Sequence, residues 1–277
     1  MTSPNERPPR GPRPKKRYGQ HFLTDKNIIR KIVRAAGIEE GDQVLEIGPG
    51  TGALTEGFIE AGAFVLAIEV DTGLIEELKR KFTERFEVMT ADALKLSYTE
   101  LSRQRNVRFK LVANLPYYIS GPILAKLLEE REAFSIMVLM FQKEVGDRIA
   151  AGPGGRDYGI LSVLSQMFTE VRKEFDVPSR LFFPKPKVDS SVVSFRVLGE
   201  PKAPLDDERF FKSVVRSAFG ARRKQLVNSL CSQGIEKGQA LLALNEAGID
   251  PARRGETLNL NEFAKLAHAL YSRRKSG

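Results

Sequence analysis

The sequence is poor in the residues that build metal sites and disulfides. Its 277 residues include one cysteine, Cys231, and two histidines, His21 and His268, which lie far apart in the chain. One cysteine cannot form an internal disulfide, and this set is too small for a zinc site, so we expect no metal. Cys231 falls in a stretch with helical apolar spacing, which favours a small core residue over a nucleophile.

Long hydrophobic runs are also missing. No apolar stretch approaches the length of a transmembrane span, and no signal-peptide core follows the basic N-terminus. We therefore expect a cytoplasmic protein with no membrane partner, acting as a monomer. The chain has 44 Lys and Arg against 35 Asp and Glu, a net charge of +9. This excess favours a polyanionic partner, although charge alone does not choose between nucleic acid and an anionic membrane.

Apolar runs alternate with helical patterns along the first half of the chain. Residues 1–16 are rich in Pro, Arg and Lys and predict a disordered basic tail, which is either a loose RNA contact or a solubilising extension. Asp25 is then expected to cap a helix. The alternation predicts a doubly wound α/β sheet with parallel strands at 43–47, 64–68, 86–90, 109–113 and 136–141. Two last strands, within 167–177 and 191–197, are expected to pair near its edge.

A glycine-rich turn follows the first of these strands. Residues 43–47 lead into Gly48-Pro49-Gly50-Thr51-Gly52, and a helix is expected from about Ala53. Such a turn lets the backbone approach a ligand closely, but nicotinamide and flavin enzymes also use one. Here Glu46 lies inside the strand, which gives Glu-x-Gly-x-Gly-x-Gly and not the dinucleotide pattern.

Acidic residues follow the next two strands. Glu69 ends the second strand, where a carboxylate could hold both hydroxyls of a ribose. Asp92 follows the third strand, where it could meet an adenine amine. Taken singly, each is as consistent with a helix cap or a turn. Together, the three strand ends fit S-adenosylmethionine better than a nicotinamide cofactor.

The most informative segment is Asn114-Leu115-Pro116-Tyr117, which follows the strand at 109–113. An amide, a rigid proline and an aromatic ring are poor core material at a strand end, but they suit a flat ring that bears an amine. Asn114 Oδ1 and the Leu115 carbonyl could accept both hydrogens of that amine, and Tyr117 could stack on the ring. The segment therefore predicts methylation of an amino nitrogen on a base.

Several motifs occur together along the chain: Arg17-Tyr18-Gly19-Gln20-His21-Phe22-Leu23, Glu46-Ile47-Gly48-Pro49-Gly50-Thr51-Gly52, Ile68-Glu69-Val70-Asp71, Ala91-Asp92-Ala93, Asn114-Leu115-Pro116-Tyr117, Gln142-Lys143-Glu144 and Phe182-Phe183-Pro184-Lys185-Pro186-Lys187-Val188-Asp189-Ser190. From Arg17 to near the C-terminus, the chain resembles the ribosomal RNA adenine N6,N6-dimethyltransferases of the KsgA type. The Asn-Leu-Pro-Tyr and Phe-x-Pro-x-Pro-Lys-Val-Asp-Ser motifs make the resemblance specific. Two positions depart from it: Tyr118 stands where the bacterial pattern more often has Asn, and His21 stands where some members have Asn.

The resemblance implies a Rossmann-like S-adenosylmethionine-dependent methyltransferase domain over residues 17–200, with a mostly parallel seven-stranded sheet. A small helical RNA-binding domain is expected over 201–277. The implied donor-binding residues are His21, Leu23, Gly48, Glu69, Asp92 and Asn114. The implied catalytic residues are Asn114, Leu115, Pro116, Tyr117 and Phe182, with the Phe182 ring stacking on the face of the base opposite Tyr117.

Basic side chains are candidates for phosphate contacts. They are Lys185 and Lys187 in the Phe-x-Pro-x-Pro segment, and Arg216, Arg222, Arg223 and Lys224 beside an apolar helical stripe at 210–219. A basic helix face is most often only solvated. Overall basicity and an RNA-modifying site favour phosphate binding here.

By resemblance, the substrate is the pair of adjacent adenosines in the 3′-terminal hairpin loop of small-subunit (16S) ribosomal RNA, each dimethylated at N6 during 30S subunit biogenesis. One alternative is a large-subunit adenine methylase of the macrolide-resistance type, although the Phe-Pro-Lys-Pro-Lys-Val-Asp-Ser form and a full C-terminal domain weigh against it. Another is a non-catalytic nucleic-acid-binding assembly or transcription factor on the same fold. The intact Gly48, Glu69, Asp92 and Asn114 weigh against that class.

Overall fold

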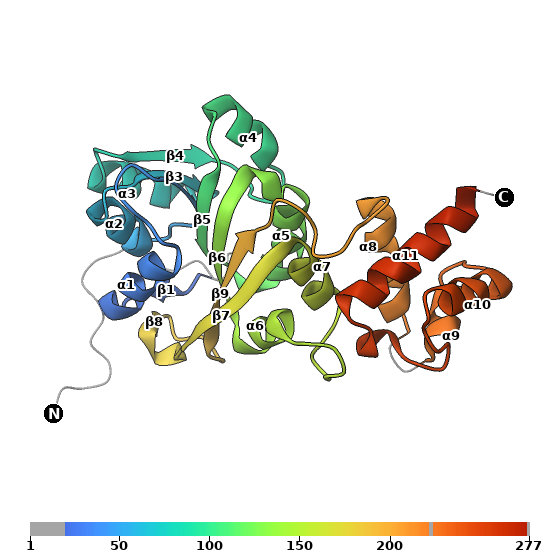
Figure 1. Cartoon of the computed structure of the whole chain (residues 1–277). Coiled ribbons are helices and arrows are strands. Elements are labelled where there is room, and N and C mark those ends of the chain that lie inside the picture. Colours follow the sequence, from blue (N-terminus) through green and yellow to red (C-terminus); the bar gives the residue numbers. More distant parts are fainter. Residues whose placement is uncertain (1–19, 222–223, 276–277) are drawn as a thin grey trace. The chain divides into compact units, whose positions relative to one another are not determined.

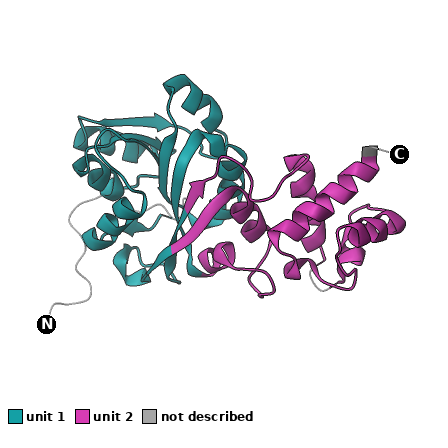
Figure 2. Ribbon diagram, viewed as in Figure 1, with its two compact units in different colours: residues 1–143, 174–194 teal, residues 144–173, 195–277 magenta. Residues whose placement is uncertain are grey.

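The computed structural model describes residues 20–221 and 224–275 (Figure 1). It divides into two compact units (Figure 2). Unit 1 holds the residues up to 143 together with 174–194, and unit 2 holds 144–173 and the residues from 195 onward. The predicted domain boundary at residue 200 stays a prediction. The basic tail at 1–16 and two of the candidate phosphate contacts, Arg222 and Arg223, lie outside the described residues.

A seven-stranded sheet forms the framework (Figure 1), and it confirms the predicted fold. The strand order is β4-β3-β2-β5-β6-β9-β7, and the β2–β3, β3–β4, β2–β5 and β5–β6 pairs are parallel. All seven strands overlap the predicted ones closely, and β9 and β7 are neighbours at one end of the sheet as expected. The strands are β2 Gln43–Ile47, β3 Phe64–Glu69, β4 Phe86–Thr90, β5 Phe109–Asn114, β6 Phe134–Gln142, β7 Thr169–Val177 and β9 Ser190–Val197.

The strand order creates a crevice in the middle of unit 1. The chain runs outward from β2 through β3 to β4, and then returns to the other side of β2 to form β5 and β6. At such a reversal, the loops after the two central strands diverge and leave room for a ligand at the carboxyl edge of the sheet. The ends of β2 and β5 therefore define where the site must lie.

Helices and a buried apolar cluster hold this sheet. Asp25 caps α1 as predicted, because its Oδ1 accepts from the backbone N–H groups of Asn27 at 2.9 Å and Ile28 at 3.0 Å. Apolar side chains of α1 and α2 pack with one face of the sheet around the fully buried Phe58. The helices of this part are α1 Lys26–Ala35, α2 Ala53–Glu60, α3 Thr72–Lys81, α4 Tyr98–Arg105 and α5 Ser120–Glu129.

Unit 2 is mainly helical. In α8, Phe211, Val214, Val215 and Ala218 are buried at helical spacing, and the Phe211 ring meets that of Phe168 edge-on at 6.3 Å between centroids. The half-buried Cys231 ends α9. In the described ranges, none of the helices combines the length and apolar character needed to cross a membrane. The helices are α6 Lys143–Ala150, α7 Ile160–Phe168, α8 Glu208–Phe219, α9 Leu226–Cys231, α10 Lys237–Glu246 and α11 Leu260–Lys275.

A separate two-stranded sheet joins the N-terminal segment to the Phe-x-Pro-x-Pro motif. β1 Phe22–Leu23 pairs antiparallel with β8 Phe182–Phe183. Successive side chains of a strand point to opposite faces, so only one Phe of β8 enters the core. That ring is Phe182, which is 4% exposed and packs in the same cluster as Leu23 and Val177, whereas Phe183 is 43% exposed. This burial disagrees with the expectation that Phe182 presents its ring to a base.

The two neighbouring rings of β8 predict contrasting effects on stability. Phe182→Ala should lower the free energy of unfolding by about 3–5 kcal/mol, because it empties a packed core position. The matched substitution Phe183→Ala, on the open side of the strand, should change it by less than about 0.5 kcal/mol. Urea unfolding followed by circular dichroism measures both. Equal, small effects would contradict the placement of Phe182 in the core.

Candidate active site

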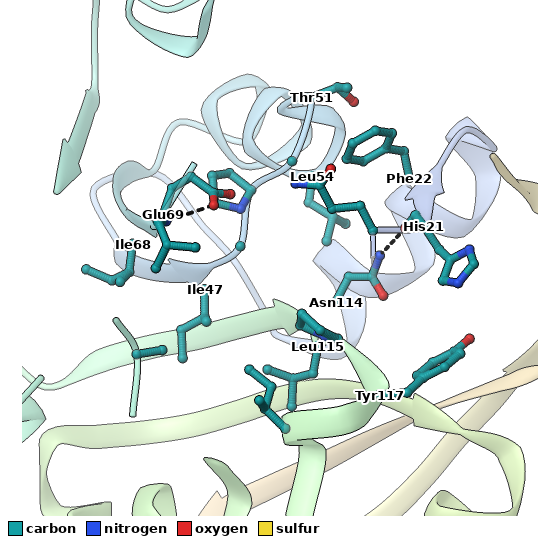
Figure 3. A pocket seen from close by; sticks show the side chains of 18 of the residues that line it. His21, Phe22, Ile47, Thr51, Leu54, Ile68, Glu69, Asn114, Leu115 and Tyr117 are labelled. Atoms are coloured by element: carbon teal, nitrogen blue, oxygen red, sulfur yellow. Dashed lines mark hydrogen bonds between the residues drawn. The ribbon is translucent and has the colours of Figure 1, made fainter. Parts of the chain in front are cut away.

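A cavity opens at the carboxyl edge of the sheet in unit 1 (Figure 3). Five segments line it: the chain just before α1, the turn after β2, and the ends of β3, β4 and β5. The lining covers residues 20–23, 47–51, 53–54, 68–70, 91–94 and 114–119. The structure thus brings together nine of the predicted site residues: His21, Leu23, Gly48, Glu69, Asp92, Asn114, Leu115, Pro116 and Tyr117. Phe182 is not among the residues that line this cavity.

The glycine-rich turn presents bare backbone to the cavity. Gly48 and Gly50 have φ angles of +69° and +59°, which side-chain-bearing residues rarely adopt. A Cβ at Gly50 would also lie 2.8 Å from the Phe22 ring, so the turn has no room for one. A ligand in the cavity can therefore approach this stretch of main chain closely.

Glu69 is a buried carboxylate at the end of β3. It is 7% exposed, and its Oε1 accepts from the backbone N–H groups of Val70 at 2.8 Å and Asp71 at 2.9 Å. Burial raises its pKa, and these hydrogen bonds, with another from the Gly50 backbone, oppose that rise. Glu69 therefore both lines the cavity and helps to hold the glycine-rich turn in place.

Asp92 lies on the open side of the cavity, after β4. Its side chain is exposed, and its Oδ1 accepts from the backbone N–H of Leu94 at 3.0 Å. The turn-forming interpretation of this residue is thus correct. A carboxylate has a second oxygen, so a turn-forming Asp92 can still accept a hydrogen bond from a ligand in the cavity.

The side chain of Asn114 is oriented by one long-range hydrogen bond. Asn114 ends β5, and its Nδ2 donates to the backbone carbonyl of His21 at 2.9 Å (Figure 3). Because the amide nitrogen is engaged there, the Oδ1 atom is the group that Asn114 presents as an acceptor. Leu115 and Pro116 follow along the cavity wall, and Pro116 leads into the short 3₁₀ helix η2, Tyr117–Ile119.

The segment that carries the Phe-x-Pro-x-Pro motif contacts two ring side chains that line the cavity, Tyr117 and His21. The Tyr117 hydroxyl lies 2.9 Å from Ser190 Oγ, and the ring stacks with that of His21 at 5.8 Å between centroids and 27° between planes. His21 Nδ1 in turn lies 2.6 Å from the Pro184 carbonyl. Burial raises the pKa of the Tyr117 phenol. Residue type predicts that Pro184 stiffens its loop but does not predict its contact with His21, and residue patterns alone gave no role to Ser190, although both residues lie in a motif that the resemblance marks.

The candidate phosphate contacts are divided between the two units. Lys185 and Lys187 are exposed, and the Pro184 and Ser190 contacts anchor their loop to the cavity edge. Arg216 on α8 and Lys224 after it are exposed within unit 2.

A second buried carboxyl, Glu46 on β2, lies beside the site. It is 1% exposed, and Thr55 Oγ1 donates to its Oε2 at 2.6 Å. Its buried Oε1 has no hydrogen-bond partner among the residues that the structure covers. Burial raises the pKa of Glu46 to about 8, and the charge of Glu69 adds to the rise. Only its position in the glycine motif had marked Glu46 in the sequence.

The sequence matches a known family model and close curated relatives. The model for "Ribosomal RNA adenine dimethylase" matches residues 12–271. "Ribosomal RNA small subunit methyltransferase A" of Syntrophotalea carbinolica is 46% identical over 258 residues, which cover 93% of this chain and 97% of the relative. The protein of the same name from Moorella thermoacetica is 46% identical over 266 residues, which cover 93% and 92%.

Solved structures show the same fold over nearly the whole chain. A dimethyladenosine transferase from Plasmodium falciparum superimposes with a TM-score of 0.77 at 28% identity, covering 92% of this chain and 98% of that one. The 23S rRNA methyltransferase ErmE superimposes with a TM-score of 0.68 at 26% identity, covering 90% and 99%.

Glu46 predicts a distinctive dependence of stability on pH. Its carboxyl keeps its proton in the folded protein up to about pH 8, whereas an ordinary glutamate loses it near 4.5. Between these values the folded state holds the extra proton, so the free energy of unfolding should fall as pH rises. Glu46→Gln cannot ionise and still accepts from Thr55, so wild type should lose on the order of a few kcal/mol relative to it between pH 5 and 8. Urea titrations of both proteins across this range measure the difference, and parallel curves would contradict the buried neutral state.

Proposed function

The chain belongs to the ribosomal RNA adenine dimethylase family, and we propose that it dimethylates N6 of two adjacent adenosines in the 3′-terminal hairpin loop of 16S rRNA. It is an S-adenosylmethionine-dependent rRNA (adenine-N6,N6)-dimethyltransferase that acts on the small ribosomal subunit. The observation that best supports this assignment is the oriented acceptor at the end of β5. Asn114 Nδ2 donates to the His21 carbonyl, so Oδ1 is the atom that can accept a hydrogen bond from a ligand.

That acceptor suits the chemistry of an aromatic amine. The N6 nitrogen of adenine is a poor nucleophile, because its lone pair is delocalised into the ring. Asn114 Oδ1 and the Leu115 carbonyl accept its two hydrogens and favour the pyramidal geometry that develops on attack. The remaining requirement is alignment of the nitrogen with the methyl group and its leaving sulfur, which can be worth on the order of 7–11 kcal/mol.

The other strand ends fit the methyl donor. The positive-φ turn at Gly48 and Gly50 gives close main-chain approach, Glu69 offers a buried carboxylate, and Asp92 offers an exposed one. In this assignment Glu69 accepts from the ribose hydroxyls and Asp92 from the adenine amine. His21 and Leu23, in the segment before α1, also line the cavity that would hold the donor. When bound, S-adenosylmethionine supplies a methyl group activated by a positively charged sulfur.

The target base must leave its stack to enter this cavity. Tyr117 is placed to stack on it, and the ring is already held by Ser190. Phe182 is not assigned the opposite face, because it is buried in the core. Lys185 and Lys187 on the anchored loop are assigned to RNA phosphates, and so are Arg216 and Lys224, with Arg222 and Arg223 beside them in the sequence.

The two alternatives have weaker support. Relatives at 46% identity carry the name of the small-subunit enzyme, whereas the 23S rRNA methyltransferase ErmE is only 26% identical. A non-catalytic factor would not need the full set of strand-end groups that meet in this cavity. We place the reaction in the cytoplasm, where small subunits are assembled, and assign it to a monomer.

Direct mapping tests this function. The protein is incubated with labelled donor, small subunits that lack the two modifications and unmodified large subunits, and the labelled nucleotides are located by mass spectrometry. Two adjacent N6,N6-dimethyladenosines in the 3′-terminal hairpin loop are expected. Label in 23S rRNA alone would establish the large-subunit alternative, and no label in any RNA would favour the non-catalytic one.

Donor affinity should depend on Glu69. Hydrogen bonds to charged groups contribute about 1.5–3 kcal/mol, so Glu69→Ala should weaken S-adenosylmethionine binding by roughly tenfold to a hundredfold. Glu87→Ala serves as the control, because Glu87 lies on β4, pairs with Arg105 at 2.7 Å and does not line the cavity. Calorimetric titration of both folded variants gives the comparison, and unchanged affinity in Glu69→Ala would remove this residue from the donor site.

Turnover should depend on Asn114. Asn114→Ala removes the oriented acceptor but leaves Glu69, Asp92 and the lysine-bearing loop in place. Single-turnover methylation, with donor and subunits both saturating, should slow by on the order of a hundredfold or more. A near-normal rate would refute the positioning role of Asn114, and a parallel loss of donor affinity would assign it to the donor site instead.

A further inference from the structure

We propose that Tyr118 is a second stacking residue, which holds the adenine next to the one being methylated. This inference rests on the proposed function and deepens it, because it concerns how the enzyme recognises a pair of adenosines. Tyr118 lines the same cavity as Tyr117, yet 64% of it is exposed.

The main chain on both sides of Tyr118 is held in place. Pro116 O accepts from the backbone N–H of Ile119 at 3.1 Å, and Ser120 Oγ donates to the Tyr117 carbonyl at 2.9 Å. The neighbouring ring of Tyr117 is fixed by Ser190 and His21. Single exposed apolar residues are common and need no explanation by themselves. A large ring that is open to solvent, mounted on a pinned turn and placed at the edge of a base-binding cavity is a more specific arrangement.

The substrate supplies the partner for this ring. When one adenine leaves the stack to enter the cavity, the adjacent adenine loses a stacking partner on one face. An aromatic side chain at the cavity edge can replace that partner, because every base has a π face. Each adenosine of the pair must enter the same cavity in turn, so the neighbour of the target is an adenosine in both rounds.

Tyr117 and Tyr118 differ in exposure and in contacts, and this difference assigns them different roles. Tyr117 is half-buried, with its hydroxyl bound and one face covered by His21, so it belongs to the inner site. Tyr118 is the open ring at the edge. We therefore expect Tyr118 to act on binding of the RNA and not on donor binding or on the reacting nitrogen.

The test combines a protein change with a substrate change. Small subunits are reconstituted with 16S rRNA that carries either the natural adenosine pair or an abasic nucleotide beside the target adenosine. Methylation of the target is then measured with wild type, Tyr118→Ala and Tyr118→Phe. Phe64→Ala is the matched control, because Phe64 is also an exposed ring, 45% accessible, but begins β3 at the opposite edge of the sheet.

On the natural pair, Tyr118→Ala should raise KM by about fivefold to 150-fold, with donor affinity unchanged. Tyr118→Phe and Phe64→Ala should match wild type. On the abasic substrate, wild type and Tyr118→Ala should become equal, because the base that the ring holds is gone.

Three results would overturn the inference: an unchanged KM in Tyr118→Ala, the same penalty on the abasic substrate, or a loss of donor affinity that makes the ring part of the donor site. Failure of wild type to methylate the natural pair is a different outcome. It would refute the proposed function itself, and the role of Tyr118 with it.

Discussion

The site depends on one hydrogen bond, from Asn114 Nδ2 to the His21 carbonyl, which links residues 93 positions apart. An amide has one donating and one accepting end, so engaging the nitrogen fixes where the oxygen acts. The same His21 stacks on Tyr117 and contacts the Pro184 carbonyl. The N-terminal segment, the end of β5 and the Phe-x-Pro-x-Pro motif are therefore locked together at the cavity, and each depends on the others for its position.

Glu46 and Glu69, two buried carboxyl groups on neighbouring strands, have pKa values that are set by different balances of burial and hydrogen bonding. Burial keeps Glu46 neutral up to about pH 8, and the nearby charge of Glu69 strengthens that effect. Glu69 receives backbone hydrogen bonds that favour its ionised form, against a burial that raises its pKa. The two neighbouring carboxyls therefore differ: burial dominates the pKa of Glu46, whereas backbone hydrogen bonds oppose the rise in the pKa of Glu69. The glycine-rich motif thus contributes an acid in the strand as well as bare backbone in the turn.

Much of the architecture could be predicted from the sequence, because the apolar runs of parallel strands are long and regular. The residues at Glu69, Asp92 and Asn114 could be placed together, since the carboxyl ends of parallel strands meet at one edge. The burial of Phe182 disagrees with its expected stacking role for a local reason: in a two-residue strand either Phe can face the core, and the neighbouring pairs of residues do not indicate which one does. The contacts of Ser190 with Tyr117 and of Pro184 with His21 join distant segments, so no local pattern indicates them.

The central claim is that the end of β5 holds the amine of the target adenine. A crystal structure of the protein with S-adenosylhomocysteine and a short RNA containing the adenosine pair tests it most directly. The adenine N6 should lie within about 3.2 Å of both Asn114 Oδ1 and the Leu115 carbonyl, with Asn114 Nδ2 still bound to the His21 carbonyl. An adenine bound in the cavity with its N6 away from these two oxygens would contradict the account.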